Sequence, residues 1–360
     1  MRPLPLTATA RALYAELQEQ ALLVAATSPI GASPGSVVRK EIRGRVYLYF
    51  QVRDLDGRVR QHYLGPQNDE PTAGLVAQLE GQRRDRDADA DRLDALRAAF
   101  VAAGGAALPA GPFRVIQAFA QAGLLVPGTP GVLVGTHAFH CLGNLLGVRW
   151  PQGLHTQDVD VAAERERHVE LAVAQPTLPA PDVLEQLAMG FMPVPTLDPR
   201  SPSTSYMVRG AELRVDLLTP LRGKAMGPVF VPAFGAPASP VRHLDFLLVD
   251  AIASLAIGPR GLAVVQVPHP ARFALHKLMV SMLRPAVFAT KAEKDRTQAL
   301  LVLAALIENA PDDVTAAWTD LVGRGPGWRS KVESALGRAR AQDPTLVDEV
   351  RALCGGARER

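Results

Sequence analysis

The chain has 360 residues, of which 48% are hydrophobic and 21% charged, and its 39 Lys and Arg against 36 Asp and Glu give a formal net charge of +3. This length allows two or three domains with a sizeable core, and the composition is typical of a soluble globular protein. A net charge so small neither requires nor excludes nucleic-acid binding. The two cysteines, Cys141 and Cys354, belong to no metal-type cluster and indicate neither a zinc site nor a disulfide framework.

Long apolar runs are missing from the sequence. No stretch of about 18 uninterrupted apolar residues predicts a membrane span. The first 20 residues also lack the continuous apolar run of a signal peptide. We therefore expect a cytoplasmic protein.

The N-terminal third combines helices with a small sheet. Residues 8–27 and 73–103 have helical patterns, and residues 36–64 alternate polar and apolar residues around two turns, as in a three-stranded antiparallel meander. Residues 104–112 are rich in Gly, Ala and Pro and predict a linker.

The meander carries a net charge larger than that of the whole chain. Its cationic residues outnumber its acidic ones by four, and four aromatic residues interleave with them. The charged residues are Arg39, Lys40, Arg43, Arg45, Arg53, Arg58 and Arg60 against Glu41, Asp54 and Asp56, and the aromatic residues are Tyr47, Tyr49, Phe50 and Tyr63. This pattern suits a platform for single-stranded nucleic acid. The alternative is a small sheet with an apolar inner face and an Arg-rich outer face.

The rest of the chain alternates strands and helices before becoming helical. We expect helical structure over 164–190 with Gly190 as C-cap, a loop over 192–206, and strands over 205–210 and 212–220. Short strands are expected around 243–248 and 261–267, and helices over 270–354.

Residues 131–163 contain the strongest chemical signal. An apolar strand leads into Gly135-Thr136 and an amphipathic helix, and a second strand carries Asp158 and Asp160. Carboxylates two residues apart on a strand point to the same side, about 6.6 Å apart. A Gly-Thr turn at a helix N-terminus offers backbone N–H groups to a phosphate.

A third aspartate, Asp216, lies in the apolar segment 212–220. Aspartate is depleted in strand interiors, and clustered carboxylates repel one another unless a cation neutralises them. Two Mg²⁺ ions would do so, with Mn²⁺ as an alternative. These residues indicate nucleotidyl transfer from an NTP such as ATP.

The motifs GTHAFHCLGNLLG, TQDVDVA, LRVDLLTP, HKL and KDRTQALLVL, within about 111–305, resemble the DNA polymerase β-type nucleotidyltransferase superfamily. More closely, they resemble a bacterial family related to the AbiEii and MenT-type toxin nucleotidyltransferases. The resemblance implies that Gly135 and Thr136 form the phosphate turn, and that Asp158, Asp160 and Asp216 bind metal and take part in catalysis. The turn has Thr where Ser is commonest, and the gap before Asp216 is long, which leaves Asp245 as an alternative third carboxylate.

The C-terminal helices add further candidates. Lys277 and Lys294 could contact the nucleotide phosphates, and Asp295 and Gln298 could line the cleft or hold the helices to it. The alternatives are a lysine that extends along its helix to solvent and an exposed ion pair. His137 and His140 lie one helical turn apart, and helix packing explains them better than metal binding does.

Together these features predict an α/β (α+β) fold: an N-terminal helical and meander region (1–110), a nucleotidyltransferase core with a mixed sheet (111–240), and a mainly helical C-terminal domain (241–360). The expected activity is Mg²⁺-dependent transfer of NMP from an NTP to a hydroxyl of RNA or tRNA, a protein or a small molecule, with release of pyrophosphate. The alternative is a non-catalytic protein that binds nucleic acid or a partner on the same fold. Either could be part of a toxin–antitoxin or phage-defence system.

Overall fold

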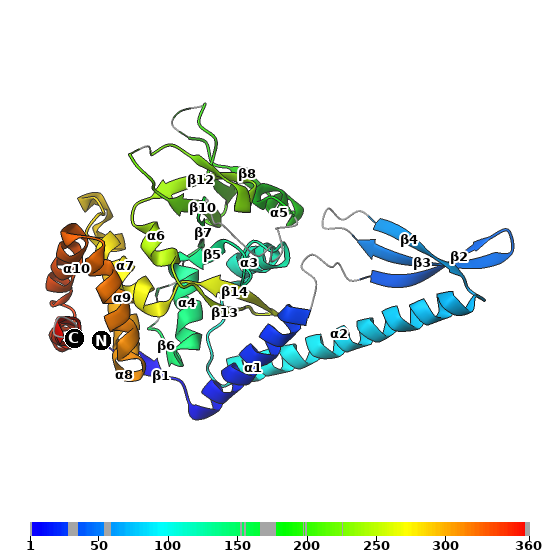
Figure 1. Ribbon diagram of the computed structural model, residues 1–360, viewed down its shortest axis with the longest axis horizontal. Coiled ribbons are helices and arrows are strands. Elements are labelled where there is room, and N and C mark those ends of the chain that lie inside the picture. Colours follow the sequence, from blue (N-terminus) through cyan, green and yellow to red (C-terminus); the bar gives the residue numbers. More distant parts are fainter. Residues whose placement is uncertain are drawn as a thin grey trace.

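The computed structural model describes residues 2–27, 35–53, 59–151, 153–154, 156–165, 178–196, 198, 200–224 and 226–356. Figure 1 shows a body of sheet and helices from which an arm extends on one side. The body holds the main buried cluster, which runs from Leu108 to Cys354.

A mixed sheet forms the centre of the body. Its hydrogen-bonded order is β11 (Val229–Val231), β12 (Ala236–Val241), β10 (Arg214–Pro220), β7 (Asp158–Ala163) and β5 (Gly131–Val134). The strand β10 also pairs with β9 (Ser205–Val208), which pairs with β8 (Phe191–Pro193). The pairs β10–β7 and β10–β12 are parallel and the others antiparallel. This mixed pairing places the N-terminal ends of β7 and β10 side by side.

Helices and a hairpin pack around this sheet. They are α3 (Ala110–Gln121), α4 (Gly135–Leu145), α5 (Ala180–Gln186), α6 (Leu244–Leu248), β13 (Ile252–Ile257) and β14 (Leu262–Val267). Helix α3 buries Phe113, Ile116 and Phe119, which recur every three residues and therefore share one face. The Gln266 N–H of β14 donates to the carbonyl of Leu125, which ties the hairpin to the segment before β5.

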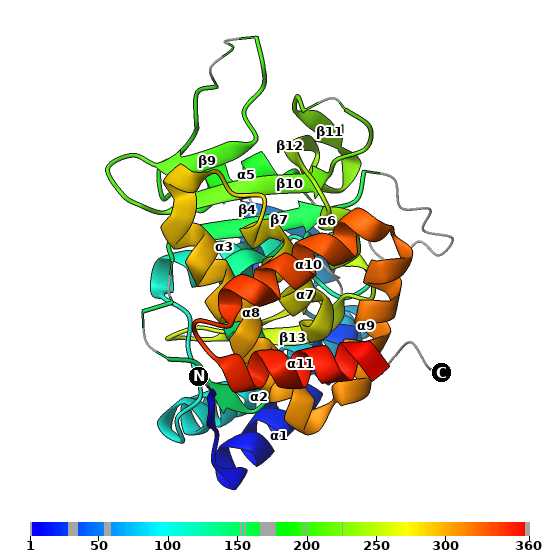
Figure 2. The same cartoon turned by 90° about the vertical axis from the view of Figure 1, so that its left-hand side faces the viewer.

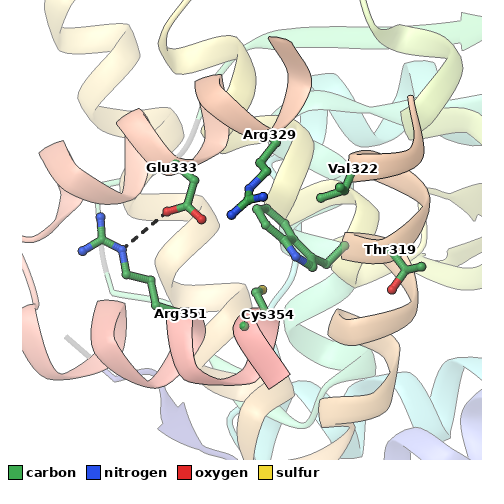
Figure 3. Close-up of a pocket in the computed structure, with 8 residues that line it drawn as sticks. Thr319, Val322, Arg329, Glu333, Arg351 and Cys354 are labelled. Atoms are coloured by element: carbon green, nitrogen blue, oxygen red, sulfur yellow. Dashed lines mark ion pairs between the residues drawn. The ribbon is translucent and has the colours of Figure 1, made fainter. Parts of the chain in front are cut away.

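Five helices form the C-terminal side of the body: α7 (Pro270–Ser281), α8 (Ala289–Asn309), α9 (Pro311–Gly323), α10 (Pro326–Ala339) and α11 (Pro344–Gly356). Four of them begin with proline, whose fixed φ and missing N–H suit the first helical position. Figure 2 shows these helices on the side of the body that faces the viewer, with β10 above them. A cavity of about 220 Å³ lies between α9, α10 and α11 (Figure 3), bordered by the Glu333–Arg351 ion pair at 3.6 Å.

The N-terminal region forms the arm and its attachment. Its elements are β1 (Leu4–Pro5), which pairs with β6 (Val148–Arg149), α1 (Ala8–Thr27), β2 (Gly35–Ile42), β3 (Arg45–Arg53), β4 (Val59–Pro66) and α2 (Glu70–Ala102). The antiparallel sheet β2–β3–β4 lies along the distal part of α2 (Figure 1). The other end of α2 packs beside α1, where Phe100 contacts Tyr14 and Arg97 donates to the carbonyl of Pro259.

Most of the predicted elements are confirmed. The helix over 8–27, the meander, the long helix that follows it, the strand at 131–134 and the helices after 270 are present. The mixed α/β fold class is confirmed as well. Among the described residues, no helix is both long and apolar enough to cross a membrane.

Two local predictions differ from the structure. Residues 243–248 were expected as a strand, but Leu244–Leu248 form α6. Leu244, Leu247 and Leu248 are buried at helical spacing, and a short apolar run cannot be assigned to strand or helix by periodicity alone. In the expected helical stretch 164–190, helix α5 ends at Gln186, residues 164–165 are not helical, and residues 166–177 lie outside the described residues.

Candidate active site

The turn between β5 and α4 lies directly against Asp160. Gly135 has φ +69°, and a Cβ added there would lie 2.0 Å from Asp160 Oδ2. Both the backbone conformation and this close approach require glycine. Thr136, in the first turn of α4, is 7% exposed. The predicted phosphate turn and the predicted carboxylate therefore lie together.

Strand register brings the three predicted aspartates to one face of the sheet. In the parallel pair β7–β10, Asp216 is in register with Asp160, and Arg214 is in register with Asp158. Side chains at paired positions of neighbouring strands point to the same side, as do those two residues apart on one strand. Asp158, Asp160 and Asp216 consequently share a face although 56 positions separate Asp160 from Asp216 in the sequence.

The surroundings of Asp160 raise the pKa of its carboxyl group. Desolvation is the main cause and the Asp216 carboxylate the second, and together with Asp158 they raise the pKa of Asp160 to about 7, against an opposing effect of Lys277 and Arg214. A carboxylate pKa that is raised by neighbouring carboxylates indicates a site that a bound cation would stabilise.

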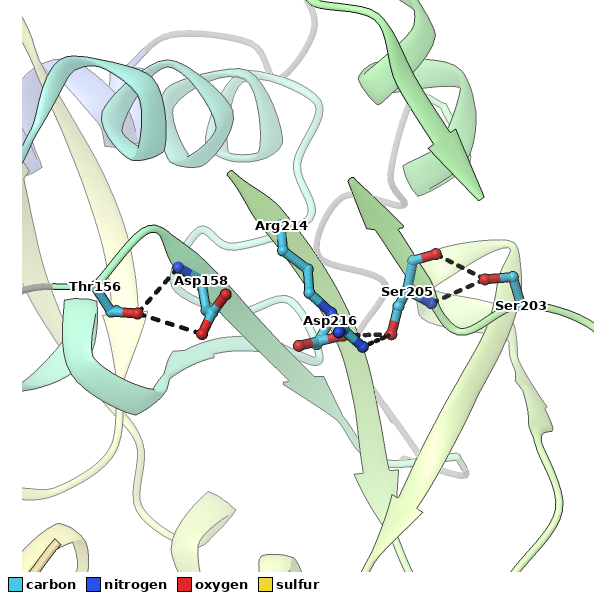
Figure 4. Close-up of polar contacts among 6 residues, drawn as sticks. All are labelled: Thr156, Asp158, Ser203, Ser205, Arg214 and Asp216. Carbon is cyan, nitrogen blue, oxygen red and sulfur yellow. Dashed lines mark hydrogen bonds and ion pairs between the residues drawn. The ribbon is translucent and has the colours of Figure 1, made fainter. Parts of the chain in front are cut away.

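Arg214 and Ser205 hold Asp216 in the structure as it stands (Figure 4). Arg214 Nε donates to Asp216 Oδ1 at 2.9 Å, and its Nη2 donates to Ser205 Oγ at 2.9 Å. The Ser205 hydroxyl in turn donates to Asp216 Oδ1. On the neighbouring strand, Thr156 Oγ1 accepts from the Asp158 N–H and donates to Asp158 Oδ2. The carboxylates of Asp158 and Asp216 are thus each oriented by hydrogen bonds from neighbouring side chains.

Two lysines from the C-terminal helices lie within electrostatic range of these carboxylates. Lys277 of α7 lowers the pKa of Asp160, and Asp158 and Asp160 act on Lys294 of α8. Desolvation and then Lys277 lower the pKa of Lys294, although the nearby carboxylates, including Asp295, oppose this. Both lysines are therefore close enough to the carboxylates to interact with them electrostatically, and their contact with phosphates stays a prediction.

Asp295 anchors this lysine arrangement. It is 3% exposed and accepts from Lys277 Nζ at 2.8 Å and from Arg284 Nε at 2.5 Å. Burial alone would raise the pKa of Asp295, but Lys277 and Arg284 outweigh burial and lower it. Asp295 thus acts as the counter-ion that positions Lys277.

Some predicted candidates lie elsewhere. Asp245, the alternative third carboxylate, lies on α6 and pairs with Arg324 of the C-terminal helices. His137 and His140 are buried on α4, at 1% and 5% exposure, as expected for helix packing. Cys141 is buried in the core, and burial raises the pKa of its thiol to about 12.

Sequence reasoning missed Arg214, Ser205, Thr156 and Arg284. One signal was available: Arg214 and Asp216 are two residues apart on a predicted strand and had to share a face. Ser205 and Arg284 had no such signal, because only the pairing of β9 with β10 and the packing of α7 on α8 bring them to the site.

The three aspartates offer carboxylate oxygens, the type of ligand that a hard divalent cation prefers. Among the residues that the structure describes, no group of three or more His, Cys, Asp or Glu side chains is arranged to hold a metal ion. In this structure Arg214 and Ser205 both donate to Asp216 Oδ1. Three carboxylates on one face, one of them desolvated, nevertheless match the oxygen ligands that Mg²⁺ prefers.

A comparison with protein-family models agrees with this geometry. A family model described as nucleotidyltransferase matches residues 112–323, which include the sheet, the three aspartates and both lysines. The chain belongs to this nucleotidyltransferase family. No curated protein and no solved structure matches it.

Proposed function

We propose that this nucleotidyltransferase uses Mg²⁺ to transfer NMP from an NTP to a hydroxyl acceptor and releases pyrophosphate. The observation that carries the proposal is the register of Asp216 with Asp160, which gathers three aspartates on one face. Gly135 lies against Asp160, and two lysines lie within electrostatic range of the carboxylates. Family membership supports transferase activity in general. The use of Mg²⁺, the NTP substrate and the hydroxyl acceptor are what we propose beyond family membership.

Each residue has a distinct role in the proposed reaction. Asp158 and Asp160 would hold Mg²⁺, which supplies charge neutralisation on the phosphates. The N–H groups at the start of α4, with Gly135 and Thr136, would bind phosphate oxygens. Lys277 and Lys294 would neutralise charge on the pyrophosphate leaving group.

Asp216 would act on the acceptor. Its carboxylate would accept the proton of the acceptor hydroxyl as the oxygen forms a bond to the α-phosphorus and the bond to pyrophosphate breaks. This role requires Arg214 to leave Asp216 Oδ1 or the other carboxylate oxygen to accept the proton, because Arg214 and Ser205 already donate to Oδ1. Arg214 could then donate to the acceptor or to a phosphate.

The activity is tested with each of the four NTPs labelled at the α-phosphate, with Mg²⁺ and with pooled RNA or protein as acceptor. We expect label in the acceptor and pyrophosphate in solution for at least one NTP, and loss of both with EDTA. Absence of pyrophosphate release with every NTP and acceptor, or label transfer that persists unchanged in Asp158→Ala, would contradict the proposal.

A second candidate function is non-catalytic binding of nucleic acid or a partner protein. The ion pair between Arg214 and Asp216 favours it, because a carboxylate neutralised by the chain itself has less need of a metal. Calorimetric titration with Mg²⁺ separates the two. Binding that disappears in Asp160→Asn supports the enzyme, and no Mg²⁺ binding with or without NTP supports the binding protein.

A role in a toxin–antitoxin or defence system is a further part of the proposal, which the resemblance to toxin nucleotidyltransferases motivates. Growth arrest on expression of the wild-type chain, absent with Asp158→Ala, would support it. Equal growth of both strains at equal protein levels would count against it.

A further inference from the structure

Three tyrosines gather on one face of the arm. Tyr49 of β3 is in register with Tyr63 of β4, and Tyr47 lies two residues before Tyr49 on the same side. The Tyr63 ring lies 5.4 Å from the Tyr49 ring and 6.1 Å from the Tyr47 ring, measured between centroids. Lys40 Nζ lies 5.1 Å above the Tyr49 ring. We call Lys40, Tyr47, Tyr49 and Tyr63 the tyrosine face.

This face lies on the side of the arm away from α2. Leu48, between Tyr47 and Tyr49, points to the opposite side and is 6% exposed. Its register partner Gly65 lies against α2, since a Cβ there would meet Thr72 Oγ1 at 2.0 Å. Tyr63 is 56% exposed. A ring that is partly open to solvent, supported by two further rings, can stack with a planar ligand.

Positive charge is concentrated on the arm. Lys40, in register with Tyr47, and Arg45, two residues before Tyr47, share the face of the tyrosines, whereas Arg39 is in register with Leu48 and points to the other face. Among the described side chains of β2, β3, β4 and the β2–β3 turn, five exposed cations accompany one acidic residue. The cations are Arg39, Lys40, Arg43, Arg45 and Arg60, and the acidic residue is Glu41. Asp54 to Arg58, which also entered the charge estimate from the sequence, lie outside the described residues. The arm therefore concentrates cationic charge that the chain as a whole nearly balances.

We propose that the tyrosine face, with the cations on it and in the adjoining β2–β3 turn, binds single-stranded nucleic acid. Aromatic rings on a sheet stack with unpaired bases, and surrounding Arg and Lys contact the phosphates. A duplex offers no free base face to Tyr63, and an uncharged protein partner would gain little from five exposed cations. The two features together fit an unpaired, polyanionic strand.

The arm and the catalytic face lie on different sides of the body. Figure 1 shows the arm on the side of α3, while the C-terminal helices that carry Lys277 and Lys294 lie on the opposite side. The arm is thus a docking element outside the site of transfer. The idea that the bound strand is also the acceptor rests on the proposed function. The binding of the strand to the arm does not depend on that function.

Binding is measured by fluorescence anisotropy of labelled oligouridylate and oligothymidylate of about 20 nucleotides, long enough to exceed the usual site size. EDTA keeps metal-dependent steps out of the measurement. The test variant is Lys40→Gln/Arg43→Gln/Arg45→Gln, which removes charge from the tyrosine face and the adjoining β2–β3 turn. The matched control, Arg83→Gln/Arg84→Gln/Arg86→Gln, removes the same charge from exposed positions of α2.

We expect the arm variant to bind more weakly. The plot of log K against log salt should also become less steep by about 2, since three cations are removed and each phosphate contact to a single strand contributes about 0.7 to the steepness. The α2 variant should behave as the wild type. No binding of either oligonucleotide to the wild type, or equal losses in the two triple variants, would overturn the proposal.

Tyr63 provides an independent test of stacking. Tyr63→Ala should weaken binding about 5- to 100-fold, and Tyr63→Phe, which keeps the ring, should restore most of it. Equal weakening in both variants would overturn the stacking role. Asp160→Asn should bind like the wild type. A protein that binds oligonucleotides but transfers no nucleotide would refute the proposed function alone, and one that transfers nucleotide without oligonucleotide binding would refute this inference alone.

Discussion

The N-terminus of α4 approaches the Asp160 carboxylate so closely that position 135 has no room for a side chain. Gly190 has a similar left-handed conformation, with φ +77°, but nothing lies within 4 Å of a Cβ added there. Substituting each glycine by alanine therefore distinguishes the effect of backbone strain, present at both positions, from the effect of a methyl group pressed against Asp160, present only at position 135.

Gly135→Ala and Gly190→Ala should each lose about 1–3 kcal/mol of stability from the strained backbone. Gly135→Ala should in addition lose nucleotidyl transfer by at least about 100-fold, because its methyl group displaces Asp160. Thermal unfolding and label transfer measure the two effects. Comparable activity in both variants would show that the contact with Asp160 is irrelevant to function.

Asp160→Asn should separate stability from activity. The amide keeps the shape but removes a desolvated charge next to Asp216, so stability should stay equal or rise by about 0.5–2 kcal/mol, whereas transfer should fall at least about 100-fold. Asp245→Asn is the control and should remain active, because Asp245 pairs with Arg324 on the C-terminal helices. If Asp245→Asn abolishes transfer and Asp160→Asn does not, the assignment of the carboxylates is wrong.

At the scale of elements, the packing of α7 on α8 positions the lysines. Asp295 joins the two helices through Lys277 and Arg284, whose side chains are 13% and 33% exposed. Breaking a fully buried ion pair costs about 3–5 kcal/mol, and the partly exposed cations reduce that cost. The junction thus contributes to stability and to the site together.

Asp295→Asn should lower the free energy of unfolding by about 2 kcal/mol at neutral pH, because it leaves Lys277 and Arg284 without their carboxylate. It should also raise the KM for NTP more than it lowers kcat, since Lys277 loses its orientation. Denaturant titration and initial rates provide the measurements. An unchanged KM would indicate that Lys277 does not contact the nucleotide.

The contribution of Asp295 to stability should depend on pH. The pKa of Asp295 is lower in the folded protein than in the unfolded chain, so its contribution is complete above about pH 4, the usual Asp pKa, and is lost as the pH falls through the lowered value. The stability difference between wild type and Asp295→Asn should therefore shrink on acidification below pH 4 or so. A difference that stays constant down to the acid transition would contradict this account.

At the scale of the molecule, α2 connects the arm to the body. This helix of 33 residues buries Thr72 near the arm and Arg97 and Phe100 near the body, and residues 82–92 between them are exposed. A helix that is polar all round is typical of a solvated connection between two parts of a protein. The dense mixed charge of residues 82–92 suits this solvated position.

Asp85→Pro should break α2 at its exposed middle, at a local cost of about 3 kcal/mol, without disturbing the body. The three tryptophans, Trp150, Trp318 and Trp328, all lie in the body and report its unfolding. We expect reduced helicity by circular dichroism and an unchanged unfolding midpoint by tryptophan fluorescence, with Asp85→Ala as control. A lower tryptophan midpoint only in the proline variant would show that the arm and the body unfold together.

Local patterns were sufficient for much of the fold and for the candidate site. Period-two alternation predicted the meander, and a Gly-Thr turn before a helix and two aspartates on an apolar strand predicted the site, because each signal lies within a few residues. The short apolar run at 244–248 was assigned wrongly, since five residues are too few for the helical period to be distinguished from a strand.

The sequence by itself determined the candidate site residues: Gly135, Asp158, Asp160 and Asp216 were identifiable because an aspartate on an apolar strand and a glycine before a helix are locally unusual. Only the tertiary structure decided which of them meet. The parallel register of β7 with β10 aligns Asp216 with Asp160, and α6 places Asp245 beside Arg324. Such pairings depend on contacts between segments far apart in the chain, which no local period encodes.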